Sequence, residues 1–193
     1  MSSFGSSILP AGGVGFRLWA PAARTVDVAI GGRFHPMQRH AGGWFEASVP
    51  DARAGTLYQY RIDGGQLVPD PASRFQPRDV DGPSEVVDPS SFRWKDGWQG
   101  RPWREAVIYE LHVGTFTPEG TYQGVQNKLS QLARDGVTAI ELMPLSDFAG
   151  RRNWGYDGVL PYAPDSVYGR PEDLKALVQA AHGAGLMIFL DVV

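Results

Sequence analysis

Cysteine is absent from the 193-residue sequence, so neither a disulfide bond nor a thiolate-ligated metal site can form. The four histidines lack the spacing of zinc-binding motifs, and we expect no metal site. No apolar run approaches the roughly 20 residues that a membrane-spanning helix requires. The first residues also lack the basic and apolar regions of a signal peptide. These absences favour a cytoplasmic protein.

The sequence also lacks a large excess of charge of either sign. The formal net charge is -3, and the one short basic pair is Arg151-Arg152, so the sequence offers no basic surface for nucleic acid. The glycine-rich segment AGGVGF precedes a predicted strand and does not open a helix, as a phosphate-binding loop would require. We therefore expect no nucleic-acid partner.

Turn residues are abundant instead, with 24 glycines and 15 prolines. In the first half they separate the short segments GFRLWAP, TVDVAIG, GWFEASVP and TLYQYRIDGG, which have the alternating or β-branched and aromatic character of strands. The pairs Gly31-Gly32 and Gly42-Gly43 and the triplet Asp63-Gly64-Gly65 indicate turns. Since no helical period occurs from Val14 to about Asp88, this half predicts an all-β sandwich.

From Ala106 the pattern changes. AVIYELHV, VTAIELMP and LMIFLDVV are typical of buried strands, and the segments between them contain apolar residues at helical spacing. The first predicted helix covers GTYQGVQNKLSQLARDG, and the second covers RPEDLKALVQAAHGAG. Pro171 suits the first turn of the second helix, and Gly183 or Gly185 ends it. This β-α-β-α-β order predicts a parallel sheet covered by helices.

Residues 68–102 are rich in Pro, Asp, Gly and Ser, but they also contain Phe75, Phe92, Trp94 and Trp98. Because disordered linkers are poor in aromatics, we expect an ordered segment that packs against both neighbours. The predicted domains are a β-sandwich over residues 1–90, an ordered linker over 91–105 and an α/β part over 106–193. The fold class is therefore multi-domain, β followed by α/β.

A connection of some two dozen residues, PLSDFAGRRNWGYDGVLPYAPDSVYG, follows the second predicted strand and has no clear period. Long loops after parallel strands are usually functional, because ligands bind at the carboxyl ends of those strands. Trp154, Tyr156 and Asp157 in this loop combine aromatic faces with polar groups, which suits a sugar. The alternative is that the rings only fill space at the rim of the fold.

Asp191 closes the third predicted strand. A carboxylate at the end of an apolar parallel strand is costly unless it has a partner or a function, and we favour a function over helix capping. Glu110 and His112 share a face of the first strand and could be catalytic, but for His112 a structural role is favoured. In the β half, aromatics on alternating strands could form a carbohydrate platform, although core positions are favoured for them; these are Trp19, Trp44, Phe45, Tyr58 and Tyr60.

The motifs YELHVGTFTPEGTY, GVTAIELMPLSDF and GRRNWGYDGVLPYAPDSVYGRPEDLKALVQAAHGAGLMIFLDVV resemble the first three βα units of the α-amylase superfamily of glycoside hydrolases. The segment GFRLWAPAARTVDVAI is similar to the N-terminal early-set domain, an immunoglobulin-like sandwich, of that superfamily's branching and debranching enzymes. The loop GRRNWGYDGV is most similar to that of the superfamily's trehalose-releasing hydrolases. Branching and debranching enzymes typically carry Gln or Asn where this chain has Asp157.

The resemblance implies a role for each matching residue. Tyr156 corresponds to the tyrosine that stacks on the sugar next to the cleaved bond, with Trp154 and Asp157 beside it. Asp191 corresponds to the aspartate of the DVVxNH motif, which supports the catalytic arginine and nucleophile by hydrogen bonding. The family's nucleophile, general acid and third carboxylate follow later barrel strands, and no pair in this sequence can be assigned the two catalytic roles of a retaining hydrolase.

The resemblance therefore implies an early-set β-sandwich, similar to a carbohydrate-binding module, followed by the first three βα units of a (β/α)₈ barrel. We expect the sequence to be the N-terminal part of a hydrolase that cleaves the α-1,4 bond next to the terminal trehalose of malto-oligosyltrehalose, and to be inactive alone. The implied substrate is a maltodextrin-type oligosaccharide, the implied pathway partner is malto-oligosyltrehalose synthase, and no cofactor is implied. The alternatives are a branching or debranching enzyme fragment and a non-catalytic glucan-binding module.

Overall fold

The computed structural model describes residues 4–95 and 97–193. Residues 1–3 of the predicted β-sandwich and residue 96 of the predicted linker lie outside the described residues. The chain divides into two compact units. Unit 1 contains the residues up to Pro89 together with Leu160–Ala163, and unit 2 contains Ser90–Val159 and Pro164–Val193. The predicted boundaries at 90 and 105 remain predictions.

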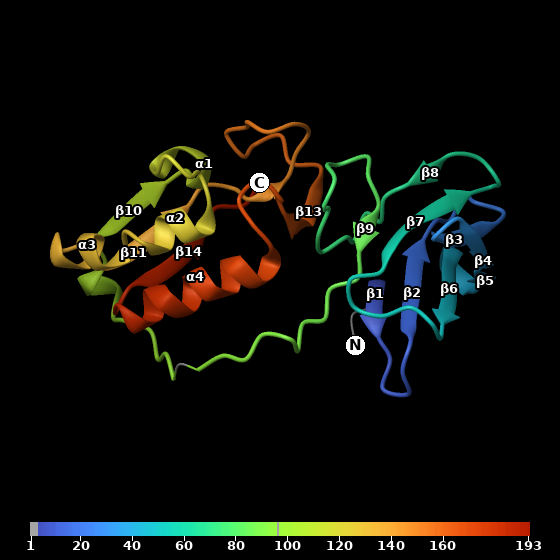
Figure 1. Ribbon diagram of the computed structural model, residues 1–193, viewed down its shortest axis with the longest axis horizontal. Coiled ribbons are helices and arrows are strands. Elements are labelled where there is room, and N and C mark those ends of the chain that lie inside the picture. Colours follow the sequence, from blue (N-terminus) through green and yellow to red (C-terminus); the bar gives the residue numbers. More distant parts are fainter. Residues whose placement is uncertain (1–3, 96) are drawn as a thin grey trace. The chain divides into compact units, whose positions relative to one another are not determined.

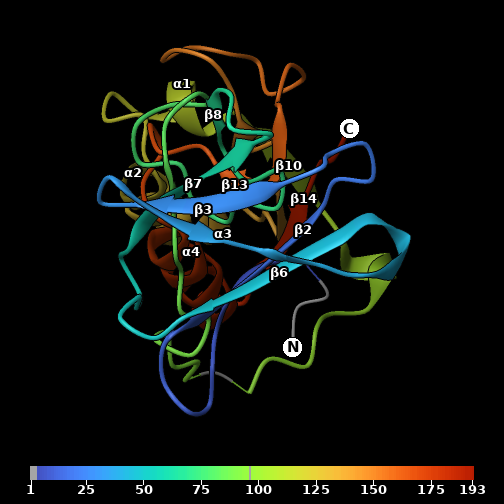
Figure 2. The same ribbon diagram turned by 90° about the vertical axis from the view of Figure 1, so that its right-hand side faces the viewer.

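Unit 1 contains two antiparallel sheets, with strand orders β1-β2-β6-β5 and β4-β3-β7-β8, and β9 pairs with β7 (Figures 1 and 2). The β-sandwich predicted from the sequence is confirmed. Its strands are β1 (Gly5–Ile8), β2 (Val14–Trp19), β3 (Val26–Ile30), β4 (Arg33–Pro36), β5 (Gln38–Arg39), β6 (Trp44–Val49), β7 (Leu57–Ile62), β8 (Leu67–Val68) and β9 (Ser84–Glu85).

Glycines build the predicted turns of unit 1. Between β3 and β4, Gly31 and Gly32 have φ values of 56° and 79°, and after β7 Asp63 and Gly64 have φ values of 50° and 72°. Two successive positive φ values match the right-handed twist of the strands that such a turn joins. A one-turn 3₁₀ segment, Ala41–Gly43, precedes β6. The three turn signals of the sequence are confirmed.

The core of unit 1 contains Phe45, Tyr58 and Tyr60, as expected, but Trp19 lies outside it with 59% of its surface exposed. The physical reason is the two-residue period of a strand. In β2 the even-numbered residues face the core, so the odd-numbered Trp19 faces away from it. Its cross-strand partner Trp44 is partly exposed, and the Arg17 guanidinium lies 4.2 Å from the centre of the Trp44 ring.

The described residues of the proline-rich segment make contacts within both units. Its first part belongs to unit 1, where Asp70, Ser73 and Gln76 are buried and hydrogen-bonded. Its later part belongs to unit 2, where the Trp98 ring stacks on His182 with centroids 4.6 Å apart. The aromatic residues of this segment therefore indicate a segment that packs against the folded parts of the chain.

Unit 2 is built on a parallel sheet of β10 (Ile108–Leu111), β11 (Ala139–Leu142) and β14 (Met187–Leu190), as the sequence predicts. Helix α4 (Pro171–Gly183) packs against β14 and against α2, one of the short helices that follow β10 (Figure 1). These short helices are α1 (Val113–Phe116), α2 (Tyr122–Gln126) and α3 (Leu129–Arg134). The buried side chains Leu111, Ile140 and Leu142 face the helices.

The single helix predicted between β10 and β11 is wrong: the structure has α2 and α3, separated at Asn127 and Lys128. The backbone tightens there, because the Lys128 N–H donates to the Val125 carbonyl and the Gln131 N–H to the Lys128 carbonyl. These bonds span three residues in place of four, which breaks the helical repeat. Val125, Leu129 and Leu132 are nevertheless buried, so the apolar stripe was read correctly.

Helix α4 begins and ends as predicted, with Pro171 in its first turn and Gly185 at a φ of 76° just after its end. The Arg170 backbone N–H donates to Asp173 Oδ2 at 2.8 Å, which satisfies one of the unpaired N–H groups at the helix start.

The long loop between β11 and α4 contains two short strands, β12 (Ser146–Asp147) and β13 (Leu160–Pro164), which the sequence did not predict.

We expect Asp173→Ala to lower the free energy of unfolding by about 1 kcal/mol, because it removes this N-terminal cap. Thermal unfolding measures the change. Glu172→Ala is the matched control, since it removes the same charge from the same turn without removing the cap bond. Equal destabilisation by both variants would contradict a role for the Asp173 bond.

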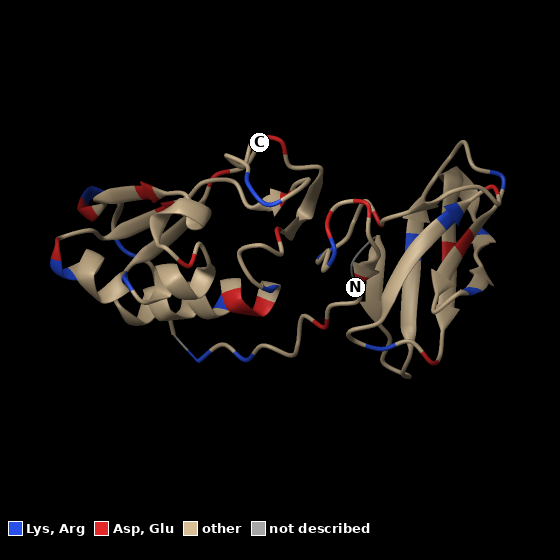
Figure 3. Ribbon diagram, turned by 45° about the horizontal axis from the view of Figure 1, so that its top comes forward, with Lys and Arg blue, Asp and Glu red and all other residues tan. Residues whose placement is uncertain are grey.

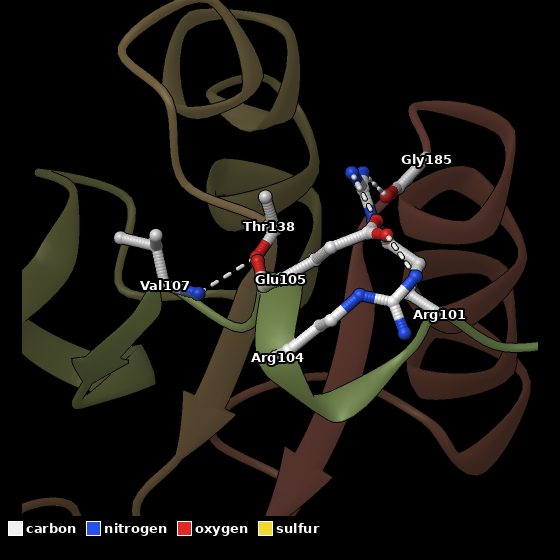
Figure 4. Close-up of polar contacts among 6 residues, drawn as sticks. All are labelled: Arg101, Arg104, Glu105, Val107, Thr138 and Gly185. Carbon is white, nitrogen blue, oxygen red and sulfur yellow. Dashed lines mark hydrogen bonds and ion pairs between the residues drawn. The ribbon is translucent and has the colours of Figure 1, made fainter.

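Polar contacts attach the segment before β10 to the rest of unit 2 (Figure 4). Arg101 Nη1 donates to the Gly185 carbonyl at 2.9 Å, and the Thr138 hydroxyl donates to the Glu105 carbonyl at 2.7 Å. The Val107 N–H in turn donates to the Thr138 hydroxyl oxygen at 2.8 Å. The start of β10 is therefore fixed beside the start of β11, which sets the register of the sheet.

Acidic and basic residues are interspersed in each unit (Figure 3). Among the described residues, no helix combines the length and apolarity needed to cross a membrane. The cytoplasmic location remains a prediction.

Candidate functional site

The carboxyl ends of the three parallel strands bring His112, Met143 and Asp191 into one row. Leu111, Leu142 and Leu190 are in register, and these three residues follow them directly. The Met143 N–H donates to the Leu111 carbonyl and the Asp191 N–H to the Leu142 carbonyl, so the ladder continues through this row. Because successive side chains alternate, the row lies on the face of the sheet opposite the helices.

Tyr156 reaches this row from the long loop. Its hydroxyl donates to Asp191 Oδ2 at 3.0 Å, and 49% of its surface is exposed. The hydrogen bond to Asp191 raises the pKa of the Tyr156 hydroxyl, and desolvation and the negative charges of Asp191, Glu110 and Glu141 add to the effect. The hydroxyl is therefore a neutral donor at physiological pH, with the ring available to a ligand.

The turn before Tyr156 is closely packed. Asn153 Oδ1 accepts a hydrogen bond from the Gly155 N–H at 2.7 Å, and Asn153 Nδ2 donates to Asp157 Oδ2 at 3.1 Å. Gly155 has a φ of 107°, and a Cβ placed on it would overlap with the Pro144 carbonyl oxygen. Only glycine fits this position without moving the loop away from the end of β11.

Beside the turn is a cavity of about 720 Å³, lined by His112, Gly114, Thr115, Met143, Arg151, Arg152, Asn153, Trp154 and Tyr168. Trp154 is 78% exposed, so its ring offers an open apolar face, while the arginines and Asn153 supply hydrogen-bond donors. Burial and the charge of Asp165 raise the pKa of Tyr168 to about 12. A ligand with apolar C–H faces and many hydroxyls matches this combination of rings and donors.

Comparison with known families assigns this architecture. Residues 72–193 match the family model for the alpha amylase catalytic domain, and residues 3–89 match carbohydrate-binding module 48, the isoamylase N-terminal domain. The chain belongs to the α-amylase family. The predicted fold class is thereby confirmed: an early-set sandwich is followed by part of an α-amylase catalytic domain.

Within the α-amylase family, the chain is 51% identical to malto-oligosyltrehalose trehalohydrolase of Deinococcus radiodurans over 191 residues, which is 98% of this chain and 32% of that protein. It is 38% identical to the 1,4-alpha-glucan branching enzyme GlgB of Rubrobacter xylanophilus over 203 aligned positions, covering 93% of this chain and 28% of that one. The chain thus spans about a third of the length of the curated relatives that it matches.

Among solved structures, the chain resembles a putative alpha amylase of Salmonella typhimurium. The identity is 50% and the TM-score is 0.96, over 100% of this chain and 33% of that one. Over residues 4–95 and 97–193, the backbone therefore has the fold found in the corresponding part of that protein.

The structure brings together the residues selected from the sequence of this α-amylase family member. Tyr156 contacts Asp191 directly, Asp157 contacts Asn153, and Trp154 lines the adjacent cavity. Their roles toward a substrate remain predictions. Within residues 4–95 and 97–193, no group of three or more His, Asp or Glu side chains has a geometry that could hold a metal ion.

Sequence reasoning gave His112 a structural role and left it out of the site. In the structure its Nε2 lies 2.7 Å from the Asn153 carbonyl oxygen, so its partner is the long loop. A signal was present in the sequence: His112 follows its strand at the position that Asp191 occupies after the third strand.

Proposed function

We propose that the whole protein is a glycoside hydrolase that cleaves the α-1,4 bond next to the terminal trehalose of malto-oligosyltrehalose and releases trehalose. The observation that carries this proposal is the Tyr156–Asp191 pair at the carboxyl ends of parallel strands, in a chain 51% identical to a malto-oligosyltrehalose trehalohydrolase. The exposed rings and donors around the pair suit a maltodextrin-type substrate.

In this proposal Tyr156 stacks on the sugar next to the cleaved bond, with its hydroxyl held by Asp191. Trp154 extends the aromatic surface along the glucan, and Asp157, held by Asn153, accepts hydrogen bonds from sugar hydroxyls. The Asp191 carboxylate also supports the groups that carry out the chemistry. These groups, a carboxylate nucleophile and a carboxylic acid, belong to other parts of the catalytic domain and act by the retaining mechanism.

The pathway partner in this proposal is malto-oligosyltrehalose synthase, which would supply the substrate. The enzyme needs no redox cofactor, since glycoside hydrolysis transfers a glycosyl group to water without a change of oxidation state. The compartment proposed is the cytoplasm, where maltodextrins are substrates of metabolism.

The test is product analysis with the whole protein. Incubation with malto-oligosyltrehalose should release free trehalose and the shortened maltodextrin. The branching enzyme, which the 38% identical relative favours as a second candidate, would instead transfer glucan segments and form α-1,6 branches in amylose. Branch formation without trehalose release would overturn the proposal in favour of this second candidate.

A further inference from the structure

Three neighbouring strand ends each hold one position of the loop that carries Tyr156. His112, after β10, contacts Asn153; Pro144, after β11, lies against Gly155; and Asp191, after β14, accepts the Tyr156 hydrogen bond. We propose that His112 is a positioning residue for Tyr156, acting through the backbone of Asn153. The proposal rests on the proposed function for its kinetic test.

The hydrogen bonds of the His112 ring define the anchor. Because a backbone carbonyl can only accept, Nε2 carries the proton in the 2.7 Å contact with Asn153. The other ring nitrogen, Nδ1, lies 3.4 Å from the Thr115 hydroxyl oxygen, and that hydroxyl donates to the His112 backbone carbonyl at 3.4 Å.

The ring cannot move freely, because it fits between two neighbours. A Cβ on Gly114 would lie 3.0 Å from His112 Cε1 and 3.0 Å from Tyr168 Cε1. The Tyr168 ring meets the His112 ring edge to face, with centroids 6.0 Å apart, and its hydroxyl lies 3.4 Å from Nε2. The absence of a side chain at Gly114 therefore makes room for the ring pair.

A short and rigid segment of the loop connects the residue that His112 holds to Tyr156. Only Trp154 and Gly155 separate Asn153 from Tyr156, and the Asn153 side chain closes this stretch by accepting from the Gly155 N–H. The close approach of Gly155 to the Pro144 carbonyl blocks movement toward β11. A displacement of the Asn153 backbone should therefore displace the Tyr156 ring by a similar distance.

The kinetic test uses the whole protein and malto-oligosyltrehalose. We expect His112→Ala to raise KM about tenfold or more, because a side chain displaced by roughly 1 Å loses much of its productive alignment. A purely structural role would lower the amount of folded enzyme and hence the apparent kcat, with KM unchanged. His112→Gln, whose amide can donate to Asn153, should recover part of the loss.

A double-mutant cycle adds a sharper criterion. In a Tyr156→Ala background the tyrosine ring is gone, so adding His112→Ala should change kcat/KM by less than about twofold. Independent, multiplying effects of the two substitutions would overturn the proposal. His182→Ala is the control for loss of a stacked histidine ring, because His182 stacks on Trp98 and lies on α4; its KM should equal that of the wild type.

Hydrogen exchange provides a readout that needs no activity. In His112→Ala, amide exchange in residues 150–158 should accelerate about tenfold, while α4 keeps its protection. Gly114→Ala should also accelerate amide exchange in residues 150–158, since it displaces the His112 ring without removing it. Unchanged exchange in residues 150–158 would overturn the positioning role. Absence of trehalose release by the wild type would instead overturn the proposed function.

Discussion

Asp191→Ala in the whole protein should lower kcat/KM for malto-oligosyltrehalose by about 100-fold or more, while the protein stays folded. The substitution removes the acceptor of the Tyr156 hydroxyl, and with it the carboxylate at the end of β14. Asp191 lies after the last residue of its strand and is partly exposed, so its loss leaves the core of unit 2 intact. Initial-rate measurements together with a thermal unfolding curve test both parts.

The matched control is Asp135→Ala, which removes the same charge from the exposed end of α3. Its kcat/KM should equal that of the wild type. Asp191→Asn should fall between wild type and Asp191→Ala, because an amide oxygen can still accept from Tyr156 but lacks the negative charge. Full activity of Asp191→Ala would show that the carboxylate has no part in the reaction.

The second large effect is expected in unit 1, where Asp70→Ala should lower the free energy of unfolding by about 3 kcal/mol. Asp70 is fully buried, with 0% of its surface exposed. Its carboxylate accepts from the Tyr58 hydroxyl at 2.6 Å, from the Tyr60 hydroxyl at 3.4 Å and from the Ala72 N–H at 2.8 Å. Removing it leaves buried donors without an acceptor, which costs more than the lost bonds alone.

Scanning calorimetry measures this effect as a shift of the transition in which unit 1 unfolds. The transition of unit 1 should fall by roughly 10 °C or more, given the size of the unit. Asp51→Ala, at an exposed aspartate of the same unit, should leave it unchanged. A shift below about 2 °C for Asp70→Ala would contradict the role of the buried network.

The same aspartate predicts a pH dependence. Burial raises the pKa of the Asp70 carboxyl, although the bonds from Tyr58 and Ala72 oppose the shift. For a carboxyl whose pKa is raised in the folded state, the stabilisation is fully present below the unfolded pKa of about 3.9 and is lost as the pH rises through the folded pKa. As the pH is raised from 4 toward neutrality, the free energy of unfolding of the wild type should therefore fall relative to that of Asp70→Asn. A difference between the two proteins that does not change with pH would contradict this expectation.

Strand patterns were the most reliable part of the sequence. The alternation in β2 and β7 and the apolar runs of β10, β11 and β14 depend only on which faces are buried, so they were visible without the fold. The break between α2 and α3 was not visible, because the apolar spacing continues across Lys128 and the tightened backbone leaves no sequence signal. Trp19 was assigned to the core by residue type, whereas its place in the alternation exposes it.

The candidate site was only partly predictable for a similar reason. Trp154, Tyr156 and Asp157 were found because they are close in sequence, and Asp191 because a carboxylate ends an apolar strand. That Tyr156 bonds Asp191, and that His112 holds Asn153, depends on contacts between residues 35 and 41 positions apart. Such pairs follow from strand order and register, which local patterns do not specify.

By itself, the sequence of this α-amylase family member determined the two kinds of architecture, the position of the long loop and the kinds of side chain in it. These features follow from local periodicity and from the conformational limits of glycine and proline. Only the tertiary structure decided which strand ends meet that loop. The parallel sheet aligns His112, Met143 and Asp191 in one row, and this alignment turns isolated residues into a site because side chains distant in sequence come within hydrogen-bonding distance.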